Sequence, residues 1–566
     1  TTGARHLLAL PPISRAADSL RVKLEMALQR RGIWSWSARP LHWTFFDPRG
    51  PSMHRRRFLQ GSAVGAATLT MPAFLAGCAK GMPTATLVGA APDDPFAAWF
   101  GVDQQTVRQV LAELGRNGAD FADLYFQHKR STSIRMEDGI IGEASSSISQ
   151  GVGLRVVIGD QTGYAFTEEL TLDAMRVAAR TAAAIASGAS PRLPPDQLQW
   201  PEIARRDLYR LTVPWSEVGI ADKLPKIAHL EAITRAADPA VQKVSISWSD
   251  EEERVLVATL EGLVYRDQRP QTRLWATVVA ERNGVTQSNS ANLAGRYGFD
   301  YYTDERLAEL SRQAVDRTLR LFDARRPPAG EMPVVLAAGA SGILLHEAVG
   351  HGLEADFNRK GTSIYADMMG EQVAADFVTV VDSGTEPGER GALSFDDEGN
   401  PAQRTVLIDK GRLNSYMHDR ISARHYGVEA TGSGRRESYK HVPMPRMRCT
   451  FMEDGPHTRD EIIASVDRGI IAETFTNGQV QIGAGDFTFY IKNGWLIEGG
   501  KITAPIKDVN IIGNGPAALK AVTMAANDAK LDTGGWTCGK NGQGVPVSQG
   551  LPTVLVSSLT VGGVDA

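Results

Sequence analysis

The sequence has few cysteines and histidines, and it lacks an excess of charge of either sign. Its 566 residues include only 3 Cys and 11 His. Three cysteines (Cys78, Cys449 and Cys538) are too few for a disulfide framework. With 61 basic against 65 acidic residues the formal net charge is -4, so the composition does not favour nucleic acid as a partner. Hydrophobic residues make up 42% of the chain, which excludes a wholly disordered protein.

The N-terminal region also lacks an apolar run long enough to cross a membrane. Within Met53–Lys80, an arginine cluster precedes an apolar run of about 17 small residues, whereas a spanning helix needs roughly 20. Arg55 and Arg56, followed by a Phe-Leu pair, resemble a twin-arginine export signal. The sequence LAGC at 75–78 resembles a lipoprotein cleavage box, so Cys78 is the expected lipidation site.

This signal and the changes in composition divide the chain into five parts. Residues 1–52 are expected to be an over-extended start without structure, and residues 53–77 are expected to be the signal peptide. Residues 78–100 form a linker rich in Pro, Gly and Ala. We expect an N-terminal α/β domain over residues 101–325 and a C-terminal β-rich domain, carrying the metal site proposed below, over residues 326–566.

The expected mature chain is more acidic than the whole sequence. The first 77 residues hold 11 of the 61 basic and 3 of the 65 acidic residues, so a chain beginning at Cys78 has 489 residues and a net charge of -12. Membrane attachment would therefore rest on a lipid at Cys78 and not on charge. The predicted location is the periplasm or cell envelope, reached by the twin-arginine pathway.

Hydrophobic periodicity predicts the same order of elements twice in the N-terminal half. Helical spacing predicts helices over residues 104–114, 172–186, 221–236 and 304–321. Alternating runs predict strands between the members of each helix pair, so we expect one αβ unit used twice. The predicted strands are 120–127, 131–136, 151–158, 162–166, 241–248, 254–260 and 273–281.

Strands dominate the sequence beyond about residue 390. Hairpin turns are predicted at Asp409–Gly411, Lys492–Gly494 and Glu498–Gly500, and amphipathic helices at 459–468 and 517–527. The predicted fold class is α/β in the mixed, α+β sense. It has helix-flanked sheets in the N-terminal part and a C-terminal domain rich in antiparallel strands.

The strongest chemical motif is His346, Glu347 and His351 in ILLHEAVGHGLEADF, in the order H-E-x-x-x-H. It is one residue longer than the zincin motif, in which two histidines bind zinc and the glutamate is the general base. On an ideal α-helix a five-residue step leaves the two imidazoles about 140° apart. Because Gly350 and Gly352 lie at this point, we expect either a π-type bulge or a helix end that lets both histidines reach one metal ion.

A catalytic zinc usually takes three protein ligands and leaves one position for water. The nearby acidic candidates for the third ligand are Glu354 and Asp356, and the distant one is Cys538, whose thiolate would bind zinc strongly. Cys449 is a weaker candidate. A fourth protein ligand, again Glu354 or Asp356, would instead indicate a structural zinc in a non-catalytic envelope lipoprotein that binds peptides or a partner protein.

Several separate blocks of the sequence resemble the TldD/PmbA family of zinc metalloproteases, on the TldD side. The resemblance runs from about residue 100 to the C-terminus. It implies a mixed α/β N-terminal domain, a β-rich C-terminal domain, and cleavage of unfolded or extended peptides. It also implies a dimer that encloses the active site, either a homodimer or a heterodimer with a PmbA-like subunit. The blocks are LLHEAVGHGLEADF, FDDEGNPAQRTVLIDKGRL, ATGSGRRESYKHVPMPRMR, IGNGPAALK and TCGKNGQGVPV.

The same resemblance assigns the site residues by position. His346 and His351 match the family's zinc histidines, Glu347 matches its general base, and Cys538 matches its third zinc ligand. It therefore implies one Zn²⁺ in each catalytic subunit. This chain departs from the family pattern in its export signal and at Cys449.

Overall fold

The computed structural model describes most of the chain beyond the expected linker. The described residues are 94–185, 202–203, 206–209 and 211–563. They belong to one compact unit of the chain, Gly81–Ala566. The expected signal peptide and Cys78 lie outside the described residues. Among the described residues, no helix is both long and apolar enough to cross a membrane.

The N-terminal half is built on one sheet of long strands. Its strands are β1 (Phe121–Glu137), β2 (Ile140–Ile158), β3 (Gln161–Thr167), β4 (Glu202–Ile203), β5 (Val241–Thr259), β6 (Val264–Arg282) and β7 (Val285–Gly295). Their order is β3-β2-β1-β5-β6-β4, with β7 also paired to β6. All pairs are antiparallel except β4–β6. The runs 120–127 and 131–136, predicted separately, are one strand, and so are 241–248 and 254–260.

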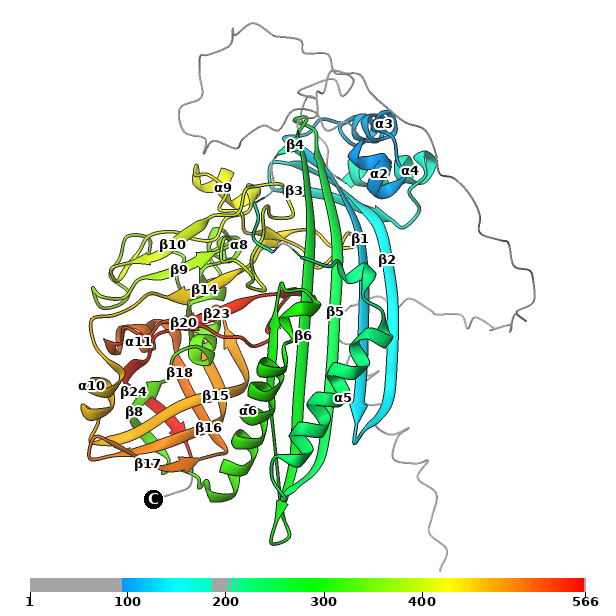
Figure 1. The fold of residues 1–566 in the computed structure, drawn as a ribbon. Helices are drawn as coiled ribbons and strands as arrows, with labels where there is room; N and C mark the ends of the chain where they lie inside the picture. Colours follow the sequence, from blue (N-terminus) through cyan, green and yellow to red (C-terminus); the bar gives the residue numbers. More distant parts are fainter. Residues whose placement is uncertain (1–93, 186–201, 204–205, 210, 564–566) are drawn as a thin grey trace, which may run out of the picture. The chain divides into compact units, whose positions relative to one another are not determined.

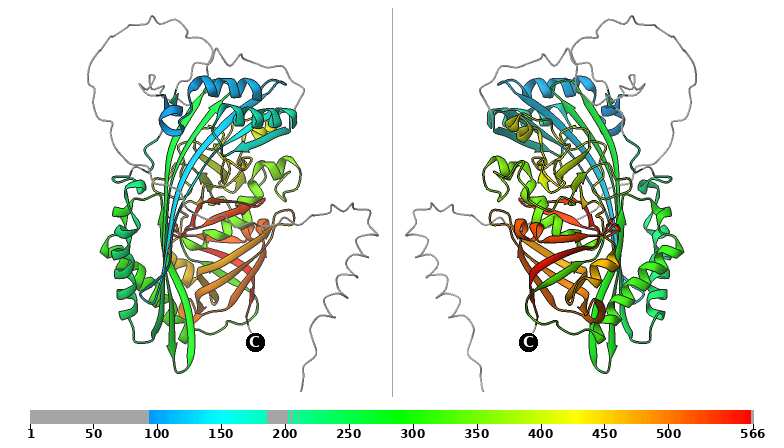
Figure 2. Two further views of the ribbon diagram at one scale, coloured as in Figure 1. Left: turned by 90° about the vertical axis from the view of Figure 1, so that its right-hand side faces the viewer. Right: turned by 90° about the vertical axis from the view of Figure 1, so that its left-hand side faces the viewer.

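Helices pack near both ends of these long strands (Figures 1 and 2). They are α2 (Pro95–Phe100), α3 (Gln104–Leu114), α4 (Leu172–Ile185), α5 (Ile220–Ala236) and α6 (Asp304–Asp323). Both halves of this region follow the order helix, three strands, helix. The even-numbered Leu124, Phe126 and Ile134 of β1 pack against helices, whereas the odd-numbered Tyr125 packs against Phe395 and Tyr439 of the C-terminal half. The period-two alternation of a strand thus gives the sheet one helical face and one face toward the C-terminal half.

The C-terminal half contains two larger sheets. The first comprises β8 (Gly330–Leu336), β15 (Arg468–Gln481), β16 (Asp486–Glu498), β17 (Lys501–Ile506), β18 (Val509–Asn514), β19 (Val522–Ala525) and β24 (Val554–Gly562). The second comprises β9 (Val380–Ser383), β10 (Arg404–Asp409), β11 (Arg412–Leu413), β14 (Cys449–Met452), β20 (Lys530–Leu531) and β23 (Ser548–Leu551). Most pairs are antiparallel, with β8–β15 and β14–β23 parallel. The mixed α/β class with an antiparallel-rich C-terminal half is confirmed.

Shorter elements complete the C-terminal half. They are the hairpin strands β12 (Gly434–Arg435) and β13 (Met444–Pro445), and the helices α9 (Arg420–Tyr426), α10 (Arg459–Ala464) and α11 (Gly515–Lys520). The predicted hairpin turns at Asp409–Gly411 and Glu498–Gly500 are present, since they join β10 to β11 and β16 to β17.

Two local predictions for this half are wrong. Lys492–Gly494 is not a turn but the middle of β16. The Asn493 side chain is buried there and pairs with Asn289 and with the carbonyl of Arg317, so tertiary hydrogen bonds hold this residue in the strand. The helix predicted over 517–527 ends at Lys520 and gives way to β19, because Val522–Ala525 pairs with β24.

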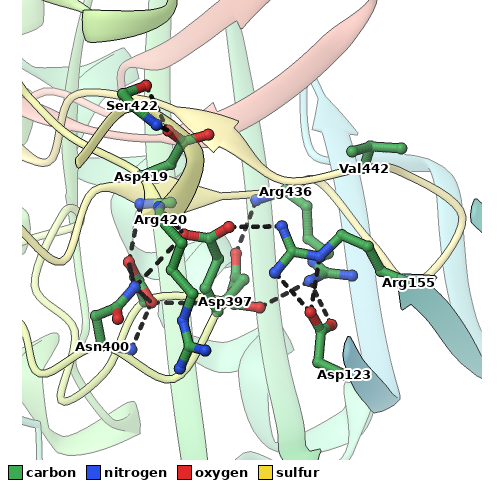
Figure 3. A network of polar contacts seen from close by, with 12 residues as sticks. Asp123, Arg155, Asp397, Asn400, Asp419, Arg420, Ser422, Arg436 and Val442 are labelled. Atoms are coloured by element: carbon green, nitrogen blue, oxygen red, sulfur yellow. Dashed lines mark hydrogen bonds and ion pairs between the residues drawn. The ribbon is translucent and has the colours of Figure 1, made fainter. Parts of the chain in front are cut away.

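A buried network of charged groups joins the two halves (Figure 3). Arg155 of β2 is fully buried and contacts Asp123 of β1 at 2.5 Å and Glu398 at 2.5 Å. Arg436 reaches Asp123 at 3.2 Å, and its backbone N–H donates to Asp397 at 2.8 Å. Buried charges are tolerated only when they are paired and hydrogen-bonded. The FDDEGN loop is therefore held against β1 and β2 by opposite charges.

Replacing Arg155 tests this junction. Arg155→Met removes the cation but leaves Asp123 and Glu398 buried, and loss of one partner of a buried pair costs about 3–5 kcal/mol. We expect a clearly lower midpoint of urea unfolding. Arg312→Ala, which removes an exposed arginine paired with Glu309, is the matched control and should change the midpoint little. Equal effects of the two substitutions would contradict a structural role for the network.

Candidate metal centre

The H-E-x-x-x-H motif lies on a distorted helical segment directly after β8. The segment begins as α7 (Ile343–Leu345), continues through a wide turn over His346–Gly350 and a tight turn over His351–Leu353, and ends as α8 (Ala355–Arg359). In the wide turn the backbone N–H of His351 donates to the carbonyl of His346, five residues earlier. Of the two expected distortions, a π-type bulge and a helix end, this five-residue hydrogen-bonded turn is the bulge. It brings the two imidazoles to a ring-centroid distance of 5.0 Å.

Close packing explains the glycines of this segment. A Cβ at Gly350 would lie 2.0 Å from Met447 Sδ, and a Cβ at Gly352 would lie 2.6 Å from the ring of Tyr365. Gly350 has an ordinary helical φ of -57°, so its requirement is for space and not for an unusual backbone conformation. Met447 and Tyr365 are both fully buried, which leaves them little room to move.

A hairpin carries Cys538 to the two histidines. Its strands are β21 (Thr537–Lys540) and β22 (Gln543–Pro546), joined by a two-residue Asn-Gly turn in which both φ angles are positive. The buried Arg446 holds this hairpin by donating to the carbonyl of Cys538 at 2.6 Å. Cys538 Sγ lies 3.4 Å from His351 Nε2, and the ligand atoms of His346, His351 and Cys538 all lie within 4.8 Å of one another.

Glu354 and Asp356, the other candidate ligands, are engaged elsewhere. Glu354 Oε2 lies 3.0 Å from His351 Nδ1, the ring nitrogen that does not face Cys538, and 3.1 Å from Lys540 Nζ. Asp356 pairs with Lys540 at 2.7 Å. A carboxylate bound to the far nitrogen of a metal-binding histidine orients the ring and fixes its tautomer. Glu354 is therefore placed to position His351. No motif in the sequence points to Lys540.

The electrostatics of the cluster favour a thiolate. Burial raises the pKa of the Cys538 thiol, but His346 and His351 lower it by more, so it lies well below its ordinary value. Burial raises the pKa of Glu354, but Lys540 and His351 bring it down to about 2. His346 Nδ1 is buried with no hydrogen-bond partner among the described residues. Two imidazoles and a thiolate form a donor set that suits zinc.

A cavity of about 330 Å³ opens onto the cluster. Glu347, Trp536 and Gln549 line it together with the three donors. Gly478 of β15 also lines it, and a Cβ there would lie 3.4 Å from Glu347 Cγ and 2.5 Å from the ring of Phe489. Glycine at 478 thus lets β15 pass directly beside Glu347. A buried donor set, a carboxylate and open space are brought together in one place.

Comparison with known proteins places the chain in a family. Models of the PmbA/TldA metallopeptidase domain 1, central domain and C-terminal domain match residues 122–186, 213–322 and 329–563. The chain belongs to the PmbA/TldD metallopeptidase family. All four residues proposed for the site fall within the C-terminal domain of that family.

This chain matches individual relatives over nearly the whole length of those relatives. A metalloprotease TldD homolog of Haemophilus influenzae is 42% identical over 468 residues, which is 81% of this chain and 96% of the relative. One from Buchnera aphidicola is 37% identical and covers 82% of this chain and 96% of the relative. The crystal structure of TldE from Thermococcus kodakarensis has a TM-score of 0.64 at 18% identity, covering 81% of this chain and all of that one. The last likeness is one of fold.

The two described cysteines provide a matched test of metal binding. Loss of a hydrogen-bond partner of a metal ligand weakens metal binding roughly 10–100-fold. Cys538→Ala should weaken zinc binding by more than this, because it removes the proposed ligand itself. Cys449→Ala is the control, because Cys449 is equally buried but lies on β14 outside the cluster. Metal analysis after dialysis against a weak chelator measures the difference. Retention of one zinc by Cys538→Ala would show that this residue is not a ligand.

Gly350→Ala tests the close packing of the wide turn. The added methyl collides with Met447, so we expect a loss of about 1–3 kcal/mol in unfolding free energy, together with weaker zinc binding. Adding Met447→Ala should restore part of the zinc binding, because it frees the space. Gly142→Ala is the control, since nothing lies within 4 Å of a Cβ at that position. If Gly350→Ala bound zinc as the unaltered protein does, the packing argument would fail.

Proposed function

We propose that this chain is a zinc-dependent peptidase that hydrolyses peptide bonds in unfolded or extended peptides. The observation that carries the proposal is a three-donor site opening into a cavity that also contains Glu347. No fourth His, Cys, Asp or Glu joins the cluster within the described part of the chain. Catalytic zinc sites keep such an open position for water or substrate, whereas structural sites close it.

Glu347 supplies the acid–base chemistry in this proposal. When bound by His346, His351 and Cys538, zinc polarises the peptide carbonyl and makes water a stronger acid. Glu347 follows His346 on the wide turn and lines the same cavity, so its carboxylate accepts a proton from the attacking water. It then passes this proton to the leaving amine, as a general base that becomes a general acid. Glu354 contacts His351 Nδ1, which leaves Nε2 facing the metal-binding cluster.

The alternative is a non-catalytic envelope lipoprotein with a structural zinc. It requires a fourth ligand, and Glu354 and Asp356 were the candidates. Both pair with Lys540. The peptidase is therefore the better supported of the two functions.

The proposal also covers the partner subunit and the cellular location of this chain. The proposal includes a dimer, either of two copies of this chain or with a PmbA-like subunit, because the resemblance of the sequence to the TldD/PmbA family implies one. Export by the twin-arginine pathway and a lipid at Cys78 rest on the sequence at 53–78. Cell fractionation with and without Cys78→Ala tests both.

Glu347→Gln tests the proposed mechanism. The amide keeps the size of the side chain but cannot accept the proton, so kcat should fall by about 10²–10⁴-fold while the protein still binds one zinc. The assay is cleavage of a library of unstructured fluorogenic peptides, with metal content measured on the same samples. Glu143→Gln, at an exposed position of β2, is the control and should retain full activity. Wild-type turnover by Glu347→Gln would remove this residue from the mechanism.

A further inference from the structure

Gln549 has an unusual environment for a buried amide. It lies on β23, in register with Thr450 of the parallel strand β14, and its side chain is fully buried. Its backbone carbonyl accepts the N–H of Asp532 at 2.8 Å. Gly550, the next residue, is so close to the start of the metal-site helix that a Cβ on Gly342 would lie 2.4 Å from its nitrogen. The backbone that carries Gln549 is thus firmly held.

The Gln549 side chain, by contrast, has no partner. Both Nε2 and Oε1 are buried without a hydrogen bond to any described residue. Leaving a buried donor and acceptor unpaired costs folding free energy, and native proteins rarely tolerate it without a functional reason. Gln549 is one of the residues that line the cavity containing Glu347 and Cys538. Its amide therefore lies in the cavity wall with hydrogen-bonding capacity that no described residue uses.

The chemistry of the cavity indicates what this molecule would offer. A carboxamide has donor N–H groups and an acceptor oxygen, which complement the carbonyl and N–H of a peptide group. Hydrolysis places negative charge on the carbonyl oxygen, and donors aimed at that oxygen stabilise the transition state. The indole N–H of Trp536, another donor of the lining, is already bonded to Asp532 at 2.5 Å. Thr537, a further residue of the lining, is exposed.

We propose that Gln549 is a catalytic residue whose Nε2 donates a hydrogen bond to the carbonyl oxygen of the scissile peptide bond. This assignment rests on the proposed peptidase function. Gln549 is not one of the proposed zinc ligands, so its role leaves His346, His351 and Cys538 as the metal-binding residues. Because the hydrogen bond strengthens as the oxygen becomes negative, its loss should lower kcat more than it raises KM.

Gln549→Met is the test variant, because methionine has a similar length and volume but no amide. We expect kcat to fall by about 10²–10³-fold, as for the loss of one oxyanion donor, with KM nearly unchanged. Zinc content should stay at one per chain. The melting temperature should stay the same or rise, because an unpaired buried amide has been removed.

Gln127→Met is the matched control. Gln127 of β1 is equally buried, but its amide is paired, since Nε2 donates to Glu253 and Oε1 accepts the Tyr439 N–H. It should show the opposite pattern, a lower melting temperature with kcat unchanged. If Gln549→Met behaved like Gln127→Met, Gln549 would be structural and the inference would be wrong.

A binding measurement separates this inference from the function on which it rests. A phosphinic analogue of a cleaved peptide carries the tetrahedral oxyanion, so Gln549→Met should weaken its binding at least 10²-fold by calorimetry. Binding of the peptide itself to Glu347→Gln should change only a few-fold when Gln549→Met is added. Unchanged analogue affinity, or loss of zinc, would overturn the role of Gln549. If the zinc-loaded unaltered protein cleaved no peptide, the proposed function itself would fail.

Discussion

The five-residue turn between His346 and His351 is the constraint on which the whole site depends. In a regular α-helix these imidazoles point in different directions, and no single ion could contact both. The wide turn corrects this angle with a hydrogen bond between residues five apart, from the N–H of His351 to the carbonyl of His346. At this turn the side chains of Met447 and Tyr365 lie against the backbone, and only glycine at 350 and 352 leaves room for them. Backbone geometry and core packing thus jointly produce the metal-binding arrangement.

The remaining groups of the site come from segments far away in the chain. Cys538 is 187 residues beyond His351, yet the two side chains touch. Lys540, on the same hairpin, pairs with Glu354, which in turn holds the far nitrogen of His351. The hairpin therefore carries Cys538 to the two histidines and, two residues later, the cation that pairs with the carboxylate behind His351.

Buried polar groups follow opposite rules at the domain junction and in the cavity. At the junction Arg155 meets two carboxylates, so each charge is balanced and the two halves are held together. In the cavity Gln549 is buried without a partner. Pairing serves stability, whereas an unpaired amide beside the metal ligands serves binding. The contrast distinguishes a structural network from a functional surface in one molecule.

The sequence by itself determined those features that depend on local periodicity and on short-range geometry. The helix over 104–114 is predicted correctly, and the distorted turn over His346–Gly350 is one of the two distortions expected there, because spacing alone decides which side chains share a face. Only the tertiary structure decided that Asn493 lies within a strand, that Glu354 supports His351, and that Cys538 completes the cluster. Those outcomes depend on contacts between distant segments, and no pattern within a short window of sequence encodes such contacts.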